Sequence, residues 1–154
     1  MRNAFIFIIM SGLLLAAPCM RVSANSPAAV EGVQLSVDQK LSIAEKQHEI
    51  IKLLIKEGQY DRVLPEWRKI LDLNLTGEYE ESVAKSAGYI AYLLAENKQY
   101  PLAHQLLDET IARMQLVGNK ASLLKVKAWV YRAEGKLQKA IETLQRAVEL
   151  EQQQ

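Results

Sequence analysis

The sequence is poor in the residues on which disulfide-bonded domains, zinc proteins and phosphate-binding enzymes depend. Its 154 residues include one cysteine and two histidines, which leaves no disulfide framework and a poor set of zinc ligands. None of its seven glycines forms a glycine-rich phosphate loop or a GxSxG motif. The 19 Lys and Arg residues nearly balance the 18 Asp and Glu residues, which gives no general case for nucleic-acid binding. We therefore expect neither an enzyme nor a nucleic-acid-binding protein.

Two short motifs resemble catalytic sites but lack what the chemistry needs. The segment His48–Lys52 begins like the HExxH motif of zinc proteases, but Lys52 replaces the second histidine, and a protonated lysine cannot bind the metal. The neighbouring carboxylates of Asp108-Glu109 and Glu80-Glu81 would point about 100° apart on a helix, so neither pair converges on a substrate. We expect both pairs on solvated helix faces, and we expect no metal and no cofactor.

Residues 1–24 have the features of a secretory signal peptide. Arg2 is basic, and Phe5–Ala17 is an apolar run that is short for a membrane span. Val22–Ala24 offers the small residues that signal peptidase prefers, so we expect the mature chain to begin at Asn25. The protein is then exported, to a periplasm or out of the cell, and has no stable membrane insertion after cleavage.

Two alternatives to cleavage at this site remain. The segment can be kept as a membrane anchor, or the chain can be a lipoprotein attached through Cys19, although Pro18 stands where a small residue is expected. Cleavage would also change the charge balance. Loss of Arg2 and Arg21 lowers the count of basic residues from 19 to 17 against 18 acidic ones, a net charge of −1.

The remainder of the chain has enough apolar residues for a core, since 49% of the whole sequence is hydrophobic. Residues 25–35 lack periodicity and are expected to form a flexible lead-in, with an ordered strap as the alternative. Ser36 and Gln39 have the spacing of a capping box, which predicts a helix from there to about Glu57. Apolar residues then recur with a helical period, which predicts six helices separated by turns near residues 58, 77, 98, 118 and 135.

The pattern also predicts details of the later helices. Pro65 and Pro101 suit first turns, where a missing amide hydrogen is tolerated. Gly118-Asn119 is expected to cap the end of the fourth helix. The last helix is expected to pack through one apolar stripe, formed by Ala140, Ile141, Leu144, Ala147 and Val148. Its polar outer face would be supplied by Glu142, Arg146 and Glu149.

Three turns of similar sequence indicate an internal repeat: Glu57–Tyr60, Asn97–Tyr100 and Glu134–Leu137. Each turn is followed three residues later by a small or branched apolar residue, in turn Val63, Ala103 and Ala140. A large residue comes four positions further on, in turn Trp67, Leu107 and Leu144. The small residues are 40 and 37 positions apart, which is the length of a two-helix unit.

On these positions the chain resembles the tetratricopeptide repeat (TPR) family. The resemblance covers about residues 44–150 and is strongest in Ala121–Leu150. It implies an all-α fold, a right-handed α-solenoid of three helix hairpins, for a repeat domain of residues 36–154. A single hairpin cannot bury its apolar face, whereas about three stacked hairpins share one core.

The resemblance also implies a binding surface, because the first helices of TPR hairpins line the concave side. Matching unit positions places eight residues there: His48, Lys52, Lys85, Tyr89, Tyr92, Lys125, Trp129 and Arg132. Trp129 lies between two cations at helical spacing, which favours binding of a peptide, including an acidic one. The alternative is that Trp129 packs against the next unit and the cations are merely solvated.

We thus expect an exported TPR scaffold that binds a partner protein or peptide in its helical groove. A structural or assembly subunit of an envelope complex, or an array that associates with itself, is the alternative.

Overall fold

The computed structural model describes residues 34–153. The predictions for the signal peptide and for most of the lead-in fall on residues 1–33 and lie outside the described residues. The described part is all-α, with six α-helices and no strand, which confirms the predicted fold class. Residues Gln34–Gln154 form a compact unit of their own, so fragments that begin at Asn25 keep its entire core. No helix within residues 34–153 combines the length and hydropathy of a membrane span.

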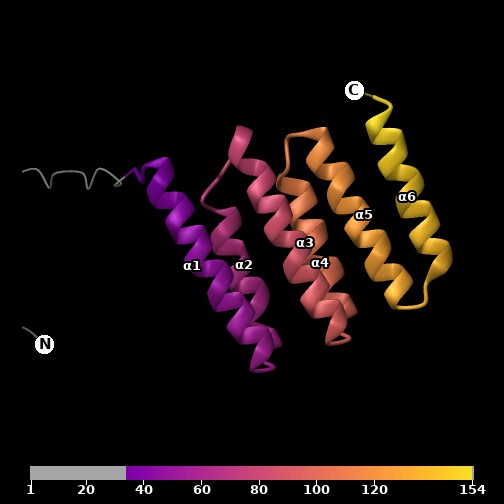
Figure 1. Ribbon diagram of the computed structural model, residues 1–154, viewed down its shortest axis with the longest axis horizontal. Helices are drawn as coiled ribbons and strands as arrows, with labels where there is room; N and C mark the ends of the chain where they lie inside the picture. The colour runs from indigo at the N-terminus through magenta and orange to yellow at the C-terminus, as the bar shows by residue number, and fades with distance from the viewer. Residues whose placement is uncertain (1–33, 154) are drawn as a thin grey trace, which may run out of the picture. The chain divides into compact units, whose positions relative to one another are not determined.

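The six helices follow one another along the molecule (Figure 1). Their bounds are α1 Val37–Lys56, α2 Val63–Leu71, α3 Glu80–Glu96, α4 Tyr100–Arg113, α5 Val117–Ala133 and α6 Leu137–Glu151. Short 3₁₀ turns, Tyr60–Arg62 and Gly77–Tyr79, precede α2 and α3. Each odd-numbered helix packs against the helix that follows it, and α3 also packs against α1 and α5. The described chain is therefore three consecutive helix hairpins with α3 in the centre.

Local sequence sets the ends of the first hairpin. The Ser36 Oγ accepts a hydrogen bond from the Gln39 backbone N–H at 3.2 Å, and the Gln39 Oε1 accepts one from the Ser36 N–H at 2.9 Å. The predicted capping box is thus present, and α1 begins directly after it. Gly58 follows α1 with φ +71°, a left-handed conformation that glycine adopts at little cost, and the chain reverses there.

The core is a continuous cluster that runs from α1 to α5. At its centre, Ala87 and Ala91 let the neighbouring helices approach α3 closely, and Ile90 and Leu94 are fully buried. The large Trp67 ring of α2 is also fully buried. Its Nε1–H donates a 2.9 Å hydrogen bond to the Thr110 Oγ1 of α4, which joins the first two hairpins. The repeated positions Val63, Ala103 and Ala140 are all buried, as their register predicts.

Two predictions are wrong: that Gly118-Asn119 caps the end of α4, and that Glu80 lies on a solvated face. Both fail because the Glu80 side chain binds the chain just before α5. α4 ends at Arg113, and Gly118-Asn119 lies in the first turn of α5 instead of capping α4. The Glu80 carboxylate, expected on a solvated face, is only 1% exposed. It accepts hydrogen bonds from the backbone N–H groups of Gln115 and Leu116 and from the Asn119 side chain, at 3.0, 2.8 and 3.1 Å. A residue of α3 therefore fixes the connection that leads into α5, whose own N-cap residue, Leu116, forms no side-chain cap.

The predicted packing of α6 is also partly wrong. Ala140 and Ala147 are buried together with Thr143, but Ile141, Leu144 and Val148 are 51%, 46% and 50% exposed. These three residues and the exposed Leu137 form one continuous face, which we call the α6 stripe. Among the described elements α6 packs extensively only against α5. Glu142, Arg146 and Glu149 are exposed as expected, but the α6 stripe is exposed as well, so the surface of the last helix is not polar throughout.

The hydrogen bonds of Glu80 yield a stability prediction. Burial raises the pKa of the Glu80 carboxyl, but the hydrogen bonds from Gln115, Asn119 and Leu116 outweigh burial and hold the pKa below its ordinary value. We expect Glu80→Ala to lower the free energy of unfolding by about 3 kcal/mol, because it leaves the buried Asn119 side chain and two partly buried backbone N–H groups without an acceptor.

Urea denaturation measures this loss, with Glu81→Ala as the matched control. Glu81 is the exposed neighbour and should change the free energy of unfolding by less than about 0.5 kcal/mol. If the two substitutions changed the free energy of unfolding equally, the hydrogen bonds of Glu80 would not stabilise the start of α5.

Candidate binding face

All eight residues predicted for the binding surface lie on the first helices of the three hairpins, α1, α3 and α5. Four of them form a row across these helices, which we call the aromatic row: His48, Tyr89, Tyr92 and Trp129. The ring centroids of His48 and Tyr89 are 5.8 Å apart, and those of Tyr92 and Trp129 are 4.9 Å apart. These are the separations of contacting aromatic rings, so the row joins α1 to α3 and α3 to α5.

Helix geometry places the two tyrosines side by side. Tyr89 and Tyr92 are three positions apart on α3, opposite the face on which Ile90 and Leu94 enter the core. They are 48% and 41% exposed. The Tyr92 hydroxyl donates a 2.8 Å hydrogen bond to Glu96, which raises the pKa of the tyrosine. Two large rings are thus held on the surface by a rigid, well-packed helix.

Trp129 combines the two roles considered for it. Its side chain is half-buried and packs against the core, and its ring also stacks on Tyr92. The residue therefore supports the aromatic row from below and presents only part of its ring to solvent.

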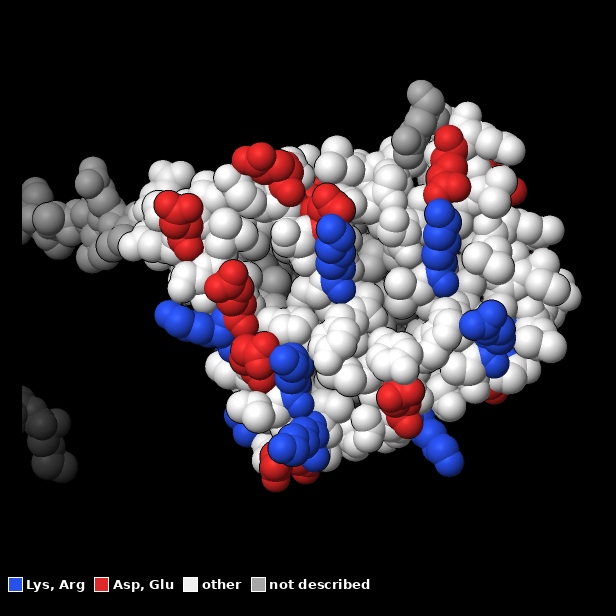
Figure 2. All heavy atoms as spheres, in the orientation of Figure 1, with Lys and Arg blue, Asp and Glu red and all other residues white. Residues whose placement is uncertain are grey.

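The predicted cations are not a free basic patch. Lys52, Lys85 and Lys125 form ion pairs with Glu49, Glu81 and Glu151, at 2.8, 2.7 and 2.6 Å. Arg132 is exposed at the end of α5. Figure 2 shows basic and acidic side chains next to one another over the side of the molecule that it displays. Local pairing therefore cancels much of the positive charge that the spacing of the lysines indicates.

His48 lies at the α1 end of the aromatic row. Burial lowers the pKa of the imidazole, the nearby Lys52 lowers it further, and Glu49 only partly opposes this. Its Nδ1 is in hydrogen-bond contact with the Ser86 Oγ of α3. His48 is thus a neutral, half-buried ring at neutral pH, suited to stacking and hydrogen bonding.

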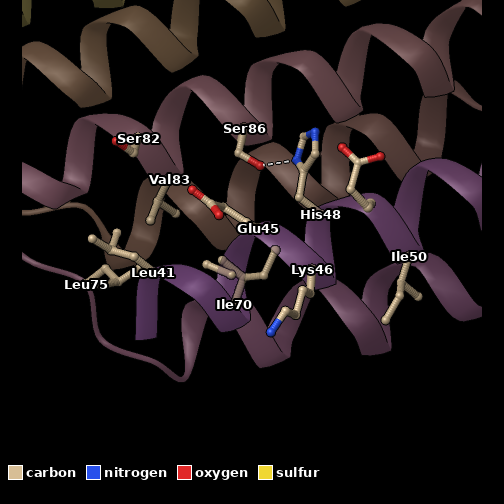
Figure 3. A pocket seen from close by; sticks show the side chains of 12 residues that line it. Leu41, Glu45, Lys46, His48, Ile50, Ile70, Leu75, Ser82, Val83 and Ser86 are labelled. Atoms are coloured by element: carbon tan, nitrogen blue, oxygen red, sulfur yellow. Dashed lines mark hydrogen bonds between the residues drawn. The ribbon is translucent and has the colours of Figure 1, made fainter. Parts of the chain in front are cut away.

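Beside His48 a cleft of about 800 Å³ opens between α1 and α3, with Ile70 of α2 and Leu75 at its base. Apolar side chains form much of its lining: Leu41, Ala44, Ile70, Leu75 and Val83. Polar and charged side chains also line it, namely Glu45, Lys46, His48, Glu49, Ser82 and Ser86 (Figure 3). A largely apolar concavity with a few polar groups is the usual make-up of a binding site.

The sequence gives no direct signal for this cleft. It exists because the first halves of α1 and α3 carry small residues where they face each other, such as Ala44, Ser82 and Ser86. Small residues occur equally at tightly packed contacts, as Ala87 and Ala91 do here, so the pattern alone cannot separate a gap from a close approach. The predicted His48 was the single residue that pointed to this region.

The second histidine lies elsewhere, on α4. Burial lowers the pKa of His104, although its 3.1 Å contact with Glu134 opposes the shift, and its ring stacks on Tyr131. Within residues 34–153 no three His, Cys, Asp or Glu side chains are grouped as metal ligands.

Comparison of the chain with protein-family models found no match, and comparisons with curated proteins and with solved structures found none either.

Proposed function

We propose that this protein is an exported TPR scaffold that binds a partner protein or peptide across the exposed face of α1, α3 and α5. The observation that carries the proposal is the aromatic row. Tyr89 and Tyr92 keep large rings in water on a rigid support, and aromatic residues in such positions dominate the energetics of protein interfaces.

The TPR assignment is supported by the arrangement of the helices. Three hairpins follow one another, and the repeated positions Val63, Ala103 and Ala140 are buried at equivalent places. A right-handed α-solenoid would place α1, α3 and α5 on its concave side, with the aromatic row along the groove. Export rests on the signal-peptide features of residues 1–24 and places the groove in a periplasm or outside the cell.

Recognition would depend on aromatic contact more than on charge. Because Lys52, Lys85 and Lys125 are already paired with glutamates, an acidic partner would have to displace those contacts. Exposed ion pairs contribute little and are screened by salt. The affinity should hence depend only weakly on ionic strength.

Peptides selected from a display library against residues 25–154 test this proposal. For the best binder, Tyr92→Ala should weaken the affinity by about 2 kcal/mol, roughly 30-fold, which is the scale of an interface hot spot. Leu116→Ala is the control, since Leu116 is 48% exposed but lies outside the aromatic row, and it should change the affinity less than about twofold. Thermal melts confirm that both variants are folded.

Failure can take two forms in this experiment. Either the library yields no binder, or the binder loses the same affinity with Leu116→Ala as with Tyr92→Ala. Both would contradict recognition through the aromatic row.

The α6 stripe favours a second candidate function, self-association of the array. Leu137, Ile141, Leu144 and Val148 follow one another at helical spacing of four, three and four residues, which is the spacing of a helix–helix seam. Exposed apolar faces of this kind mark interaction surfaces. Light scattering over a range of concentrations should show a rising mass that Leu144→Glu abolishes. A constant monomer mass would exclude this candidate.

A further inference from the structure

The cleft between α1 and α3 contains a carboxylate, that of Glu45, that is not held in an ion pair within residues 34–153. In Figure 3 the Glu45 side chain points toward α3, beside Val83, whereas Lys46, which also lines the cleft, points away from α3. The other acidic residue of the cleft, Glu49, is already paired with Lys52.

No positive charge of the protein is directed at Glu45 from the facing helix. Ser82, Val83 and Ser86 are the residues of α3 that line the cleft, and none of them is basic. His48 is held neutral at neutral pH by burial and by Lys52. An incoming cation would therefore meet the Glu45 carboxylate, which forms no ion pair within residues 34–153, next to an apolar floor.

We propose that this cleft binds a peptide segment in which apolar side chains flank a lysine or arginine. The apolar side chains would lie on Leu41, Leu75 and Val83, and the cation would pair with Glu45. The inference deepens the proposed function and rests on it, because the cleft opens next to His48 at the end of the aromatic row. It assigns a basic and apolar segment to the part of the partner that lies at this end of the face.

Charge also argues against the chain's own lead-in as the occupant. The residues between the expected cleavage site and the described part, 25–33, contain Glu31 and no lysine or arginine. This segment could offer apolar side chains, but its only charged side chain is a second carboxylate, and its one positive charge after cleavage is the α-amino group of Asn25, six positions before Glu31. A separate chain of opposite charge fits the cleft better.

The test is a nuclear magnetic resonance titration of ¹⁵N-labelled residues 25–154 with capped five-residue peptides. Two peptides, Gly-Leu-Lys-Leu-Gly and Gly-Leu-Glu-Leu-Gly, differ only in the charge of the central residue. A third, Gly-Ser-Lys-Ser-Gly, keeps the charge and removes the apolar side chains. The lysine-leucine peptide should bind best and shift the backbone amide signals of Val83 and Ser86.

Charge reversal at Glu45 provides the decisive comparison. With Glu45→Lys, the ratio of the affinities for the two leucine peptides should change by about tenfold in favour of the glutamate peptide, the size expected when one exposed ion pair is lost and another gained. Glu57→Lys is the matched control at the C-terminal end of α1, since Glu57 caps that helix, is exposed and does not line the cleft. It should leave the ratio unchanged.

Several outcomes overturn the proposal. They are an unchanged preference in Glu45→Lys, equal binding of the serine peptide, and an absence of binding. A fragment that lacks residues 25–33 tests whether the lead-in itself fills the cleft. Peptide binding that occurs only in this shorter fragment would identify the lead-in as the occupant and overturn the proposal. Binding that Tyr92→Ala weakens but Glu45→Lys does not affect would overturn this inference and leave the proposed function standing.

Discussion

The burial of α3 between its neighbours is the constraint on which the rest of the structure depends. A hairpin of two short helices cannot cover its own apolar face, so each one needs the next. α3 is the helix that meets this need on both sides, since it packs against α1, α4 and α5. Ala87 and Ala91 permit the close approach, and Ile90 and Leu94 fill the space that remains. Its first residue, Glu80, in addition holds the start of α5.

The candidate binding face is a consequence of this packing. Because one side of α3 is buried in the core, Tyr89 and Tyr92 are held on the other side by a continuous helix. His48 and Trp129 reach them from α1 and α5, so the aromatic row crosses all three hairpins. A rigid surface of this kind reduces the conformational entropy that binding would cost.

Periodicity and local capping signals were sufficient to predict the helices, because these features are encoded within a few residues. Ser36 with Gln39 and the glycine turns are examples. Long-range contacts were not predictable in this way. The burial of Glu80 depends on donors 35 and 36 positions further along the chain, and no local pattern distinguishes it from the exposed Glu81. The exposure of Leu144 likewise depends on what packs outside α6, although its repeat position matches the buried Leu107. The eight candidate residues lie on the first helices of the hairpins, as the sequence predicts. The ion pairs between the lysines and nearby glutamates were not predicted.

Hydrogen exchange of the native protein tests most directly whether α3 is the centre of stability. In the central helix, the amides should exchange only through global unfolding, so their opening free energies should equal the free energy of unfolding measured with urea. The amides of α6 should open at a lower free energy, because α6 packs extensively on α5 alone among the described elements. Protection of α6 equal to that of α3 would contradict an array whose stability is concentrated in its central hairpin.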